Sequence, residues 1–107
     1  MKVIYVAGKY SAKCDWELYN NIHKARVVAH RLWKEGWAVI CPHSNNAFFS
    51  EDNESEEWKT YMAGLLAILG RCDAIYMMKD WEESKGAPIE LREAQALGLE
   101  IIYEPES

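Results

Sequence analysis

Short apolar runs alternate along this chain with longer segments of helical periodicity, and this alternation restricts the possible folds more than any other feature. The apolar runs have the length of strands and occupy residues 2–7, 37–41, 73–78 and 99–103. Between them, residues 15–33, 58–69 and 88–97 repeat their apolar side chains about every 3.6 positions, as one face of a helix does. Strands that alternate with helices in this way predict a parallel sheet with right-handed crossovers.

The predicted fold class is α/β: a flavodoxin-like three-layer sandwich with helices on both faces of a parallel sheet. We expect four strands, or five, in the order 2-1-3-4. A chain of 107 residues can bury one core but not two, so residues 1–107 are expected to form a single domain. In that strand order, the loops after the first and third strands, residues 8–11 and 79–87, line one crevice, where ligands bind in such sheets.

Charge and hydropathy exclude several kinds of partner. The net charge of −5, from 12 Lys and Arg against 17 Asp and Glu, argues against a nucleic-acid polymer, because proteins that bind one concentrate positive charge. No apolar run approaches the roughly 20 residues of a membrane span, and strand-like sequence already begins at Lys2, so we expect no signal peptide. These features predict a cytoplasmic protein that associates with neither a nucleic acid nor a membrane.

Cysteine, histidine and glycine patterns predict no disulfide framework, metal site or nucleotide cofactor. The three cysteines are odd in number and lack C-x-x-C spacing, which indicates reduced thiols; they are Cys14, Cys41 and Cys72. The histidines do not fall into metal-ligand spacing with them. No G-x-G-x-x-G or Walker pattern is present to support a dinucleotide or ATP site.

The segment D-W-E-E-S-K-G-A-P-I-E, from Asp80 to Glu90, is the strongest candidate for chemistry. Gly86 permits close backbone approach, and Ser84 can hydrogen-bond a ligand hydroxyl or phosphate. Pro88 is expected near the first helical position, which places Glu90 in the first turn, where the helix dipole favours an ionised carboxylate. An ionised carboxylate at a cleft is a candidate nucleophile. A plain helix start with a favourable acidic residue has equal weight on the pattern alone.

Residues near this segment allow both functional and structural interpretations. Asp80 follows the third strand and is expected to point toward the crevice, whereas Asp73 is expected to cap the preceding turn. Trp81 suits stacking on a flat ligand and covering the edge of the core equally well. Gly8 would let a ligand approach the backbone, and Tyr10 offers a ring and a hydroxyl. For this loop alone, a turn with an exposed tyrosine is the favoured interpretation.

The polar stretch 43–57 is long for a structureless connection, and connections of that length tend to be functional or disordered. His43, Asn45 and Asn46 follow the second strand at its start. These side chains suit contacts to a base or a sugar, although loops contain such residues for many other reasons.

Several short motifs along nearly the whole chain resemble one family. They are V-I-Y-V-A-G-K-Y at 3–10, C-P-H at 41–43 and R-C-D-A-I at 71–75. The strongest is W-x-x-S-x-G-A-x-x-E-x-x-x-A at 81–94, which is followed by L-G-x-x-I-I-Y at 97–103. Together they resemble the nucleoside 2-deoxyribosyltransferase superfamily, and more narrowly a small DUF4406-like subfamily of bacterial and phage proteins.

The resemblance implies a homodimer or larger homo-oligomer, and chemistry at the N-glycosidic bond of a (deoxy)nucleoside or its 5′-monophosphate. It implies that Glu90 is the nucleophile of a retaining transfer or hydrolysis. The family's acidic proton donor has no counterpart at Leu65 or Ser84, so Asp80 is the candidate that remains. The candidate substrate contacts, from the resemblance and from the loops, are Gly8, Tyr10, Ser11, His43, Asn45, Trp81, Ser84 and Gly86.

Three functions are compatible with these patterns. The first is an enzyme that cleaves or transfers at an N-glycosidic bond through Glu90. The second is a nucleotide-binding module without catalysis, which serves as a sensor or sponge. The third is an interaction protein that uses its tryptophan-rich surface. Turnover would identify the first, stabilisation by nucleotides without turnover the second, and neither effect the third.

Overall fold

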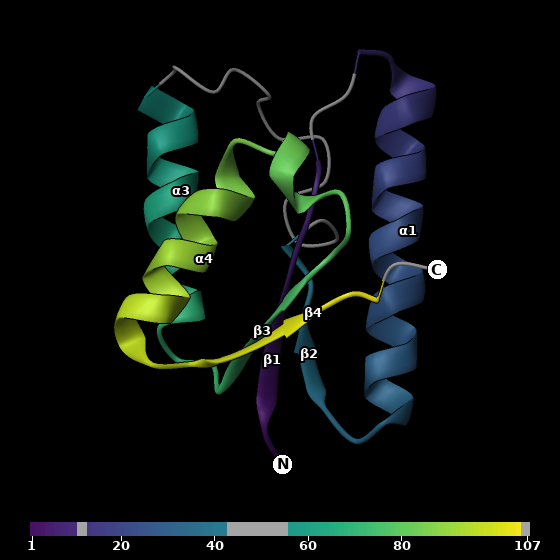
Figure 1. Cartoon of the computed structure of the whole chain (residues 1–107). Helices are drawn as coiled ribbons and strands as arrows, with labels where there is room; N and C mark the ends of the chain where they lie inside the picture. The colour runs from purple at the N-terminus through teal and green to yellow at the C-terminus, as the bar shows by residue number, and fades with distance from the viewer. Residues whose placement is uncertain (11–12, 43–55, 106–107) are drawn as a thin grey trace.

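A computed structural model describes residues 1–10, 13–42 and 56–105 and shows three layers (Figure 1). The elements, in chain order, are β1 (Val3–Ala7), α1 (Asp15–Lys34), β2 (Ala38–Ile40), α3 (Glu56–Leu69), β3 (Ala74–Met77), the 3₁₀ helix η1 (Trp81–Glu83), α4 (Gly86–Leu97) and β4 (Glu100–Tyr103). The four strands of the described residues are parallel and lie in the order β2-β1-β3-β4. The predicted fold class and strand order are therefore confirmed.

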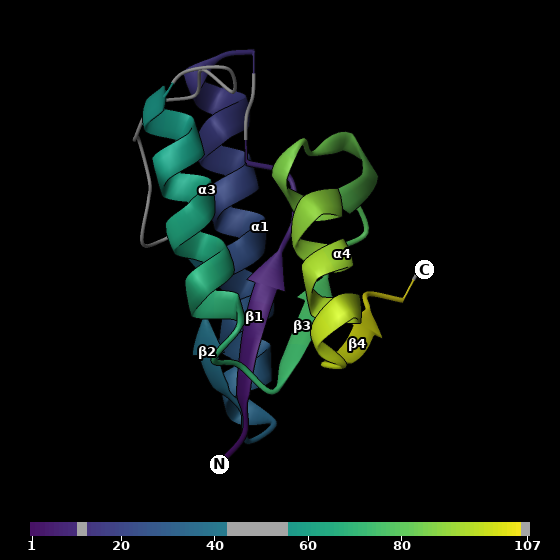
Figure 2. The same cartoon turned by 90° about the vertical axis from the view of Figure 1, so that its left-hand side faces the viewer.

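Alternate residues of the central strands point to opposite faces of the sheet, and each face has its own core. Ile4 and Val6 of β1 pack with α1 residues such as Ala25, Val28 and Leu32. Their neighbours along the strand belong to the second core, where the apolar faces of α3 and α4 meet the sheet. Figure 1 shows α1 alone on one side of the sheet, with α3 and α4 on the other. Figure 2 shows α3 on the side of β1 and β2, and α4 on the side of β3 and β4.

The helices end where the sequence predicts and begin less predictably. Gly36, with a φ of 102°, and Gly98, with a φ of 74°, hold the left-handed backbone that stops α1 and α4. Pro88 lies near the start of α4, as expected, but it is the third residue of the helix, because α4 begins two residues earlier at Gly86. Glu90 is consequently the fifth residue of α4, beyond the first turn in which it was expected.

Asp73 has a structural role that differs from the predicted turn cap. Its Oδ2 accepts a hydrogen bond of 2.7 Å from the backbone N–H of Val3, across 70 positions of the chain. This bond joins the starts of two neighbouring parallel strands, β1 and β3, at the edge of the sheet opposite the predicted crevice. In the described part of the chain, no helix has the length and apolar character needed to cross a bilayer.

Candidate active site

Glu90 and Tyr5 form a buried hydrogen-bonded pair between the sheet and α4. Tyr5 lies in the middle of β1 and its side chain is fully buried, while Glu90 is 6% exposed. The Tyr5 hydroxyl donates to Oε2 of Glu90 across 85 positions of the chain. The other carboxylate oxygen, Oε1, has no hydrogen-bond partner among the described residues. The pair therefore combines a fixed carboxylate orientation with one oxygen that has no protein partner among the described residues.

Burial controls the protonation of both members of this pair. Loss of water raises the pKa of Glu90 to about 7, and the hydrogen bond from Tyr5 partly offsets that rise by stabilising the carboxylate. Burial, followed by the adjacent Glu90, raises the pKa of the Tyr5 hydroxyl far above its ordinary range. Tyr5 therefore stays a donor, while Glu90 exchanges its proton near neutral pH.

This electrostatic result corrects the expectation that a helix dipole keeps Glu90 ionised. The dipole acts mainly on the first turn, and Glu90 lies beyond that turn. Desolvation is the largest influence on Glu90, and it favours the neutral acid. The carboxylate is therefore less ionised at neutral pH than its position in the sequence indicated.

Tyr5 is the site residue that sequence reasoning missed. It lies inside the V-I-Y-V-A run, where it reads as one apolar strand residue among others. One signal was available: a tyrosine hydroxyl in a buried strand requires a polar partner. The identity of that partner could not be predicted, because it depends on how α4 packs against β1.

Ser84 closes the amino-terminal end of α4. Its Oγ accepts hydrogen bonds from the backbone N–H groups of Gly86, at 3.2 Å, and Ala87, at 3.1 Å. Unpaired N–H groups at a helix start would otherwise be open to an anion. In this structure the Ser84 hydroxyl satisfies two of them, so its first role is structural. Its predicted contact with a sugar or phosphate stays a prediction.

Gly8, Lys9 and Asp80 join the loops after β1 and β3. Oδ1 of Asp80 accepts a hydrogen bond of 3.1 Å from the backbone N–H of Lys9, and the Lys9 ammonium contacts Glu83 at 3.2 Å. A Cβ at Gly8 would lie 2.7 Å from Sδ of Met78 and 3.1 Å from Oδ1 of Asp80. The absence of a side chain at Gly8 therefore lets the two loops meet, with Met78 and Asp80 in the space that a Cβ would need.

Trp81 belongs to the core edge in this structure. Its ring is half-buried, packs against the apolar core between the sheet and α4, and lies 6.4 Å from the ring of Tyr103 at a tilt of 49°. Of the two open interpretations for Trp81, covering the core is the one observed. A Cβ added at Gly86 would lie at ordinary contact distance from Met62. Lack of space for a side chain is therefore not the reason for a glycine at this position.

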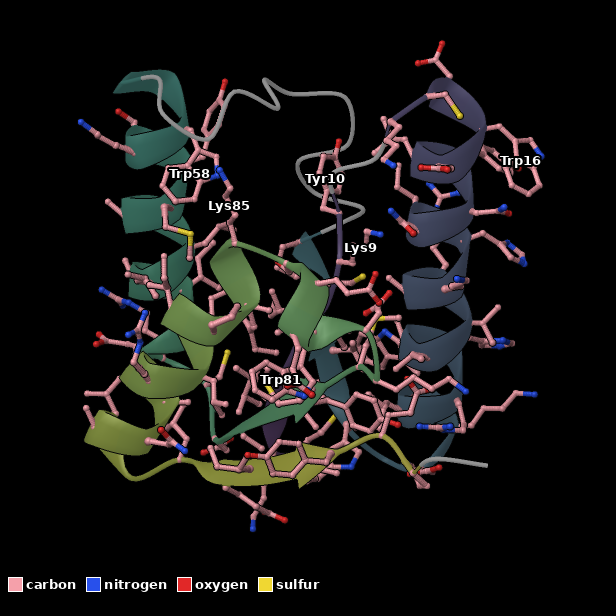
Figure 3. All side chains as sticks on the ribbon, turned by 45° about the horizontal axis from the view of Figure 1, so that its top comes forward. Lys9, Tyr10, Trp16, Trp58, Trp81 and Lys85 are labelled. Atoms are coloured by element: carbon pink, nitrogen blue, oxygen red, sulfur yellow. The ribbon has the colours of Figure 1, made fainter. Side chains whose placement is uncertain are left out.

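Of the remaining predicted substrate contacts, the structure describes only Tyr10. Tyr10 is half-buried, and its backbone carbonyl accepts a 3.1 Å hydrogen bond from Nδ2 of Asn21. Figure 3 shows Lys9 and Tyr10 after the end of β1, on the side of the molecule that also carries Trp58 and Lys85. Ser11, His43 and Asn45 lie outside the described residues.

A partly open pocket of about 230 Å³ lies beside the first turns of α1, and it contains none of the predicted catalytic residues. It is lined by Lys9, Trp16, Glu17, Asn20, Asn21 and Lys24. Within residues 1–10, 13–42 and 56–105, no three histidine, cysteine or acidic side chains gather closely enough to hold a metal ion.

Comparison with known proteins gives a family match and several related structures. The family model described as a domain of unknown function, DUF4406, matches residues 2–103. One of the related structures is a solved structure of a 2-deoxyribosyltransferase from the psychrotolerant bacterium Bacillus psychrosaccharolyticus. The alignment covers 98% of this chain and 77% of the chain of that enzyme. Its TM-score is 0.65 at 23% sequence identity, so it shares the fold. A search of curated proteins finds no match.

Proposed function

We propose that this chain, which belongs to the DUF4406 family, cleaves or transfers the N-glycosidic bond of a (deoxy)nucleoside or its 5′-monophosphate with Glu90 as the nucleophile. The structural neighbour described as a 2-deoxyribosyltransferase supports this substrate class through its fold. We propose further that residues 1–107 are a single nucleoside 2-deoxyribosyltransferase-like domain that acts in the cytoplasm as a homo-oligomer.

The observation that carries this proposal is the buried pair of Tyr5 and Glu90. A carboxyl group buried without a cationic partner lowers stability, and Glu90 has no ion-pair partner in the described structure. Groups held in such environments cluster at functional sites, because catalysis needs pKa values near the working pH. Tyr5 also belongs to β1, and the carboxyl ends of β1 and its neighbour β3 border the predicted crevice.

In the proposed reaction, one oxygen of the ionised Glu90 attacks C1′ while the bond from C1′ to the base nitrogen breaks. The electron pair of that bond leaves with the base, and a glycosyl ester forms on Glu90. Tyr5 holds the carboxylate by its second oxygen throughout. Water, or the nitrogen of a second base, then attacks C1′ from the opposite face and releases the carboxylate.

The departing base needs a proton, and we propose that Asp80 supplies it. The bond from the Lys9 N–H holds one oxygen of Asp80 at the end of β3. The second oxygen has no hydrogen-bond partner among the described residues. In the proposed complex the loops around Gly8, Tyr10, Ser11, His43, Asn45, Trp81, Ser84 and Gly86 surround the sugar, its phosphate and the base.

Base release from a panel of deoxynucleosides, ribonucleosides and their 5′-monophosphates tests this function. We expect at least one substrate to turn over with the wild-type protein and none with Glu90→Ala. Added formate should restore part of the activity of Glu90→Ala, because a small carboxylate fits the space left by the side chain. Glu93→Ala removes a carboxylate from the same helix and serves as the control. Turnover that survives Glu90→Ala would overturn the proposed role.

Nucleotide binding without catalysis is the second candidate, because two of the predicted polar site residues already have structural partners. Asp80 is bonded to the Lys9 N–H, and the Ser84 hydroxyl caps α4. Thermal unfolding with the same nucleotide panel separates the two functions. Stabilisation of both the wild type and Glu90→Gln, with no base release, would favour a binding module.

A further inference from the structure

The pocket of about 230 Å³ beside the first turns of α1 lies outside the proposed active site and is lined mostly by polar residues. We refer to it as the α1 pocket, and its lining residues are Lys9, Trp16, Glu17, Asn20, Asn21 and Lys24. The spacing of the residues from α1 places them along one side of the helix. Ile22, Ala25 and Val28 mark the other side, which faces the core. The α1 pocket is therefore a surface site between α1 and the loop after β1.

Asn21 fixes the inner wall of the α1 pocket. Its side chain is 7% exposed, and its Nδ2 donates a hydrogen bond of 3.1 Å to the backbone carbonyl of Tyr10. This bond ties the loop after β1 to α1, so Lys9 is held beside the helix. Figure 3 shows Trp16 on the side of α1 away from Lys9, so its ring belongs to the outer rim. The pocket is therefore formed before a ligand arrives, as ligand sites usually are.

Three polar side chains of the α1 pocket have hydrogen-bonding capacity that the protein does not use. Within the described part of the chain, Lys24 has no ion-pair partner, and the amide of Asn20 has no hydrogen-bond partner. Glu17 uses only one carboxylate oxygen, Oε2, which accepts a 3.1 Å bond from the backbone N–H of Lys13. The residues from Glu17 to Lys24 span about 10 Å of the helix. One small ligand can therefore contact all three without displacing a protein partner from them.

The kinds of side chain in the α1 pocket determine the kind of ligand. A lysine ammonium only donates, so Lys9 and Lys24 require acceptors, and a phosphate group offers several charged ones. A carboxylate only accepts, so Glu17 requires a donor and would repel a second anionic group. The amide of Asn20 both donates and accepts. A ligand with one anionic group and several hydroxyls satisfies all four side chains.

We propose that the α1 pocket binds a small sugar phosphate. Its phosphate contacts the ammonium groups of Lys9 and Lys24. Its hydroxyls contact Glu17 and Asn20. The pocket is smaller than the roughly 300–1,000 Å³ of sites for drug-sized ligands, so it suits a monosaccharide and not a nucleotide with its base. None of the proposed substrate contacts or catalytic residues lines the α1 pocket, so this inference does not rest on the proposed function.

Lys9 has a partner that the phosphate must displace. Its ammonium contacts Oε1 of Glu83 at 3.2 Å, and the side chain of Glu83 is 65% exposed. An ion pair as exposed as this one contributes little to stability, so a phosphate of higher charge competes with it. Glu83 lies in η1, after β3, so a bound sugar phosphate would also remove one contact between the loops after β1 and β3. Glu83→Gln should therefore increase the affinity of the α1 pocket.

Titration of the ¹⁵N-labelled protein with ribose 5-phosphate, followed by NMR, tests both the binding and its location. We expect the largest shifts at residues 16–24. Lys24→Gln should weaken binding by about tenfold to a hundredfold, because a charged hydrogen bond is lost. Lys34→Gln removes the same charge from the last turn of α1 and should leave the affinity unchanged. No binding, or shifts confined to residues 80–90, would overturn the proposal.

Inorganic phosphate and ribose test the two halves of the ligand separately. We expect each to bind more weakly than ribose 5-phosphate, because each lacks one set of contacts. Inorganic phosphate that bound as tightly would show that Glu17 and Asn20 contact no hydroxyl, and would contradict a sugar phosphate. Binding that was insensitive to both Lys24→Gln and Glu83→Gln would show that neither lysine holds the phosphate, and would overturn the proposed site. Circular dichroism checks that each variant is folded.

Discussion

Glu90 reduces the stability of the fold whenever it is ionised, because its carboxylate is removed from water. Its pKa rises from 4.5 to about 7 on folding. A carboxyl that binds its proton more tightly in the folded state stabilises the fold fully below pH 4.5 and loses that contribution as the pH rises to about 7. One pKa unit corresponds to about 1.4 kcal/mol, so about 3 kcal/mol is lost across this interval.

Glu90→Gln should remove this pH dependence, because glutamine keeps the shape and the acceptor for Tyr5 without a charge. We expect the variant to match the wild type near pH 4.5 and to exceed it by about 3 kcal/mol above pH 7. Urea unfolding at pH 4.5, 6 and 8 measures the difference. Equal differences at all three values would show that Glu90 does not titrate in this range.

Tyr5→Phe removes the hydroxyl that donates to Glu90 while keeping the ring in the core. The ionised carboxylate then loses a charge-assisted hydrogen bond of about 1.5–3 kcal/mol, so the pKa of Glu90 should rise further. The loss of stability with rising pH should move to higher pH. Any base release should decrease by about tenfold to a hundredfold at pH 7. An unchanged pH profile would contradict the positioning role of Tyr5.

At the scale of the elements, the loops after β1 and β3 depend on the absence of a side chain at Gly8. In Gly8→Ala, the new methyl group would lie 2.9 Å from Cβ of Met78, which cannot rotate away. We expect a loss of about 1–3 kcal/mol in stability. Gly64→Ala is the matched control, because nothing lies within 4 Å of the new Cβ and α3 should gain up to about 1 kcal/mol. Equal effects of the two variants would argue against close packing at Gly8.

Ser84 has both a cap role and a proposed ligand role, which stability and binding measurements can separate. Ser84→Ala should destabilise α4 by about 1 kcal/mol, because two N–H groups lose their acceptor. A cap role alone would leave KM or the nucleotide Kd unchanged once the protein is folded. An increase in either constant would show that Ser84 contacts the ligand in addition to capping α4.

Elements with strong periodicity could be predicted from sequence, whereas their exact starts and their contacts could not. The strand order followed from alternation and crossover rules, and glycines at 36 and 98 marked two helix ends. The start of α4 was missed because Pro88 is also compatible with the third helical position, once Ser84 provides the cap. The Tyr5–Glu90 pair joins residues 85 positions apart, and its burial, which determines the pKa, exists only after the layers have packed.

For the whole molecule, the burial of the strands predicts which of them exchange their amide hydrogens most slowly. β1 and β3 are central and almost entirely buried, whereas β2 and β4 lie at the edges and are only partly covered. Hydrogen exchange should therefore find the slowest amides in β1 and β3, at rates set by global unfolding, with faster exchange in β4. Equal protection of all four strands would indicate that the sheet opens only as a single unit.

The central place of β1 also affects how the chain is made. β1 leaves the ribosome before both of its neighbours, and the bond from its Val3 to Asp73 requires a residue synthesised 70 positions later. Contacts between such distant residues form slowly, and a strand is prone to aggregation until its pairing partner has been synthesised. The nascent chain therefore spends most of its synthesis with an apolar, half-paired strand exposed. Its yield in a cell should depend on chaperones that cover this strand until β3 has emerged.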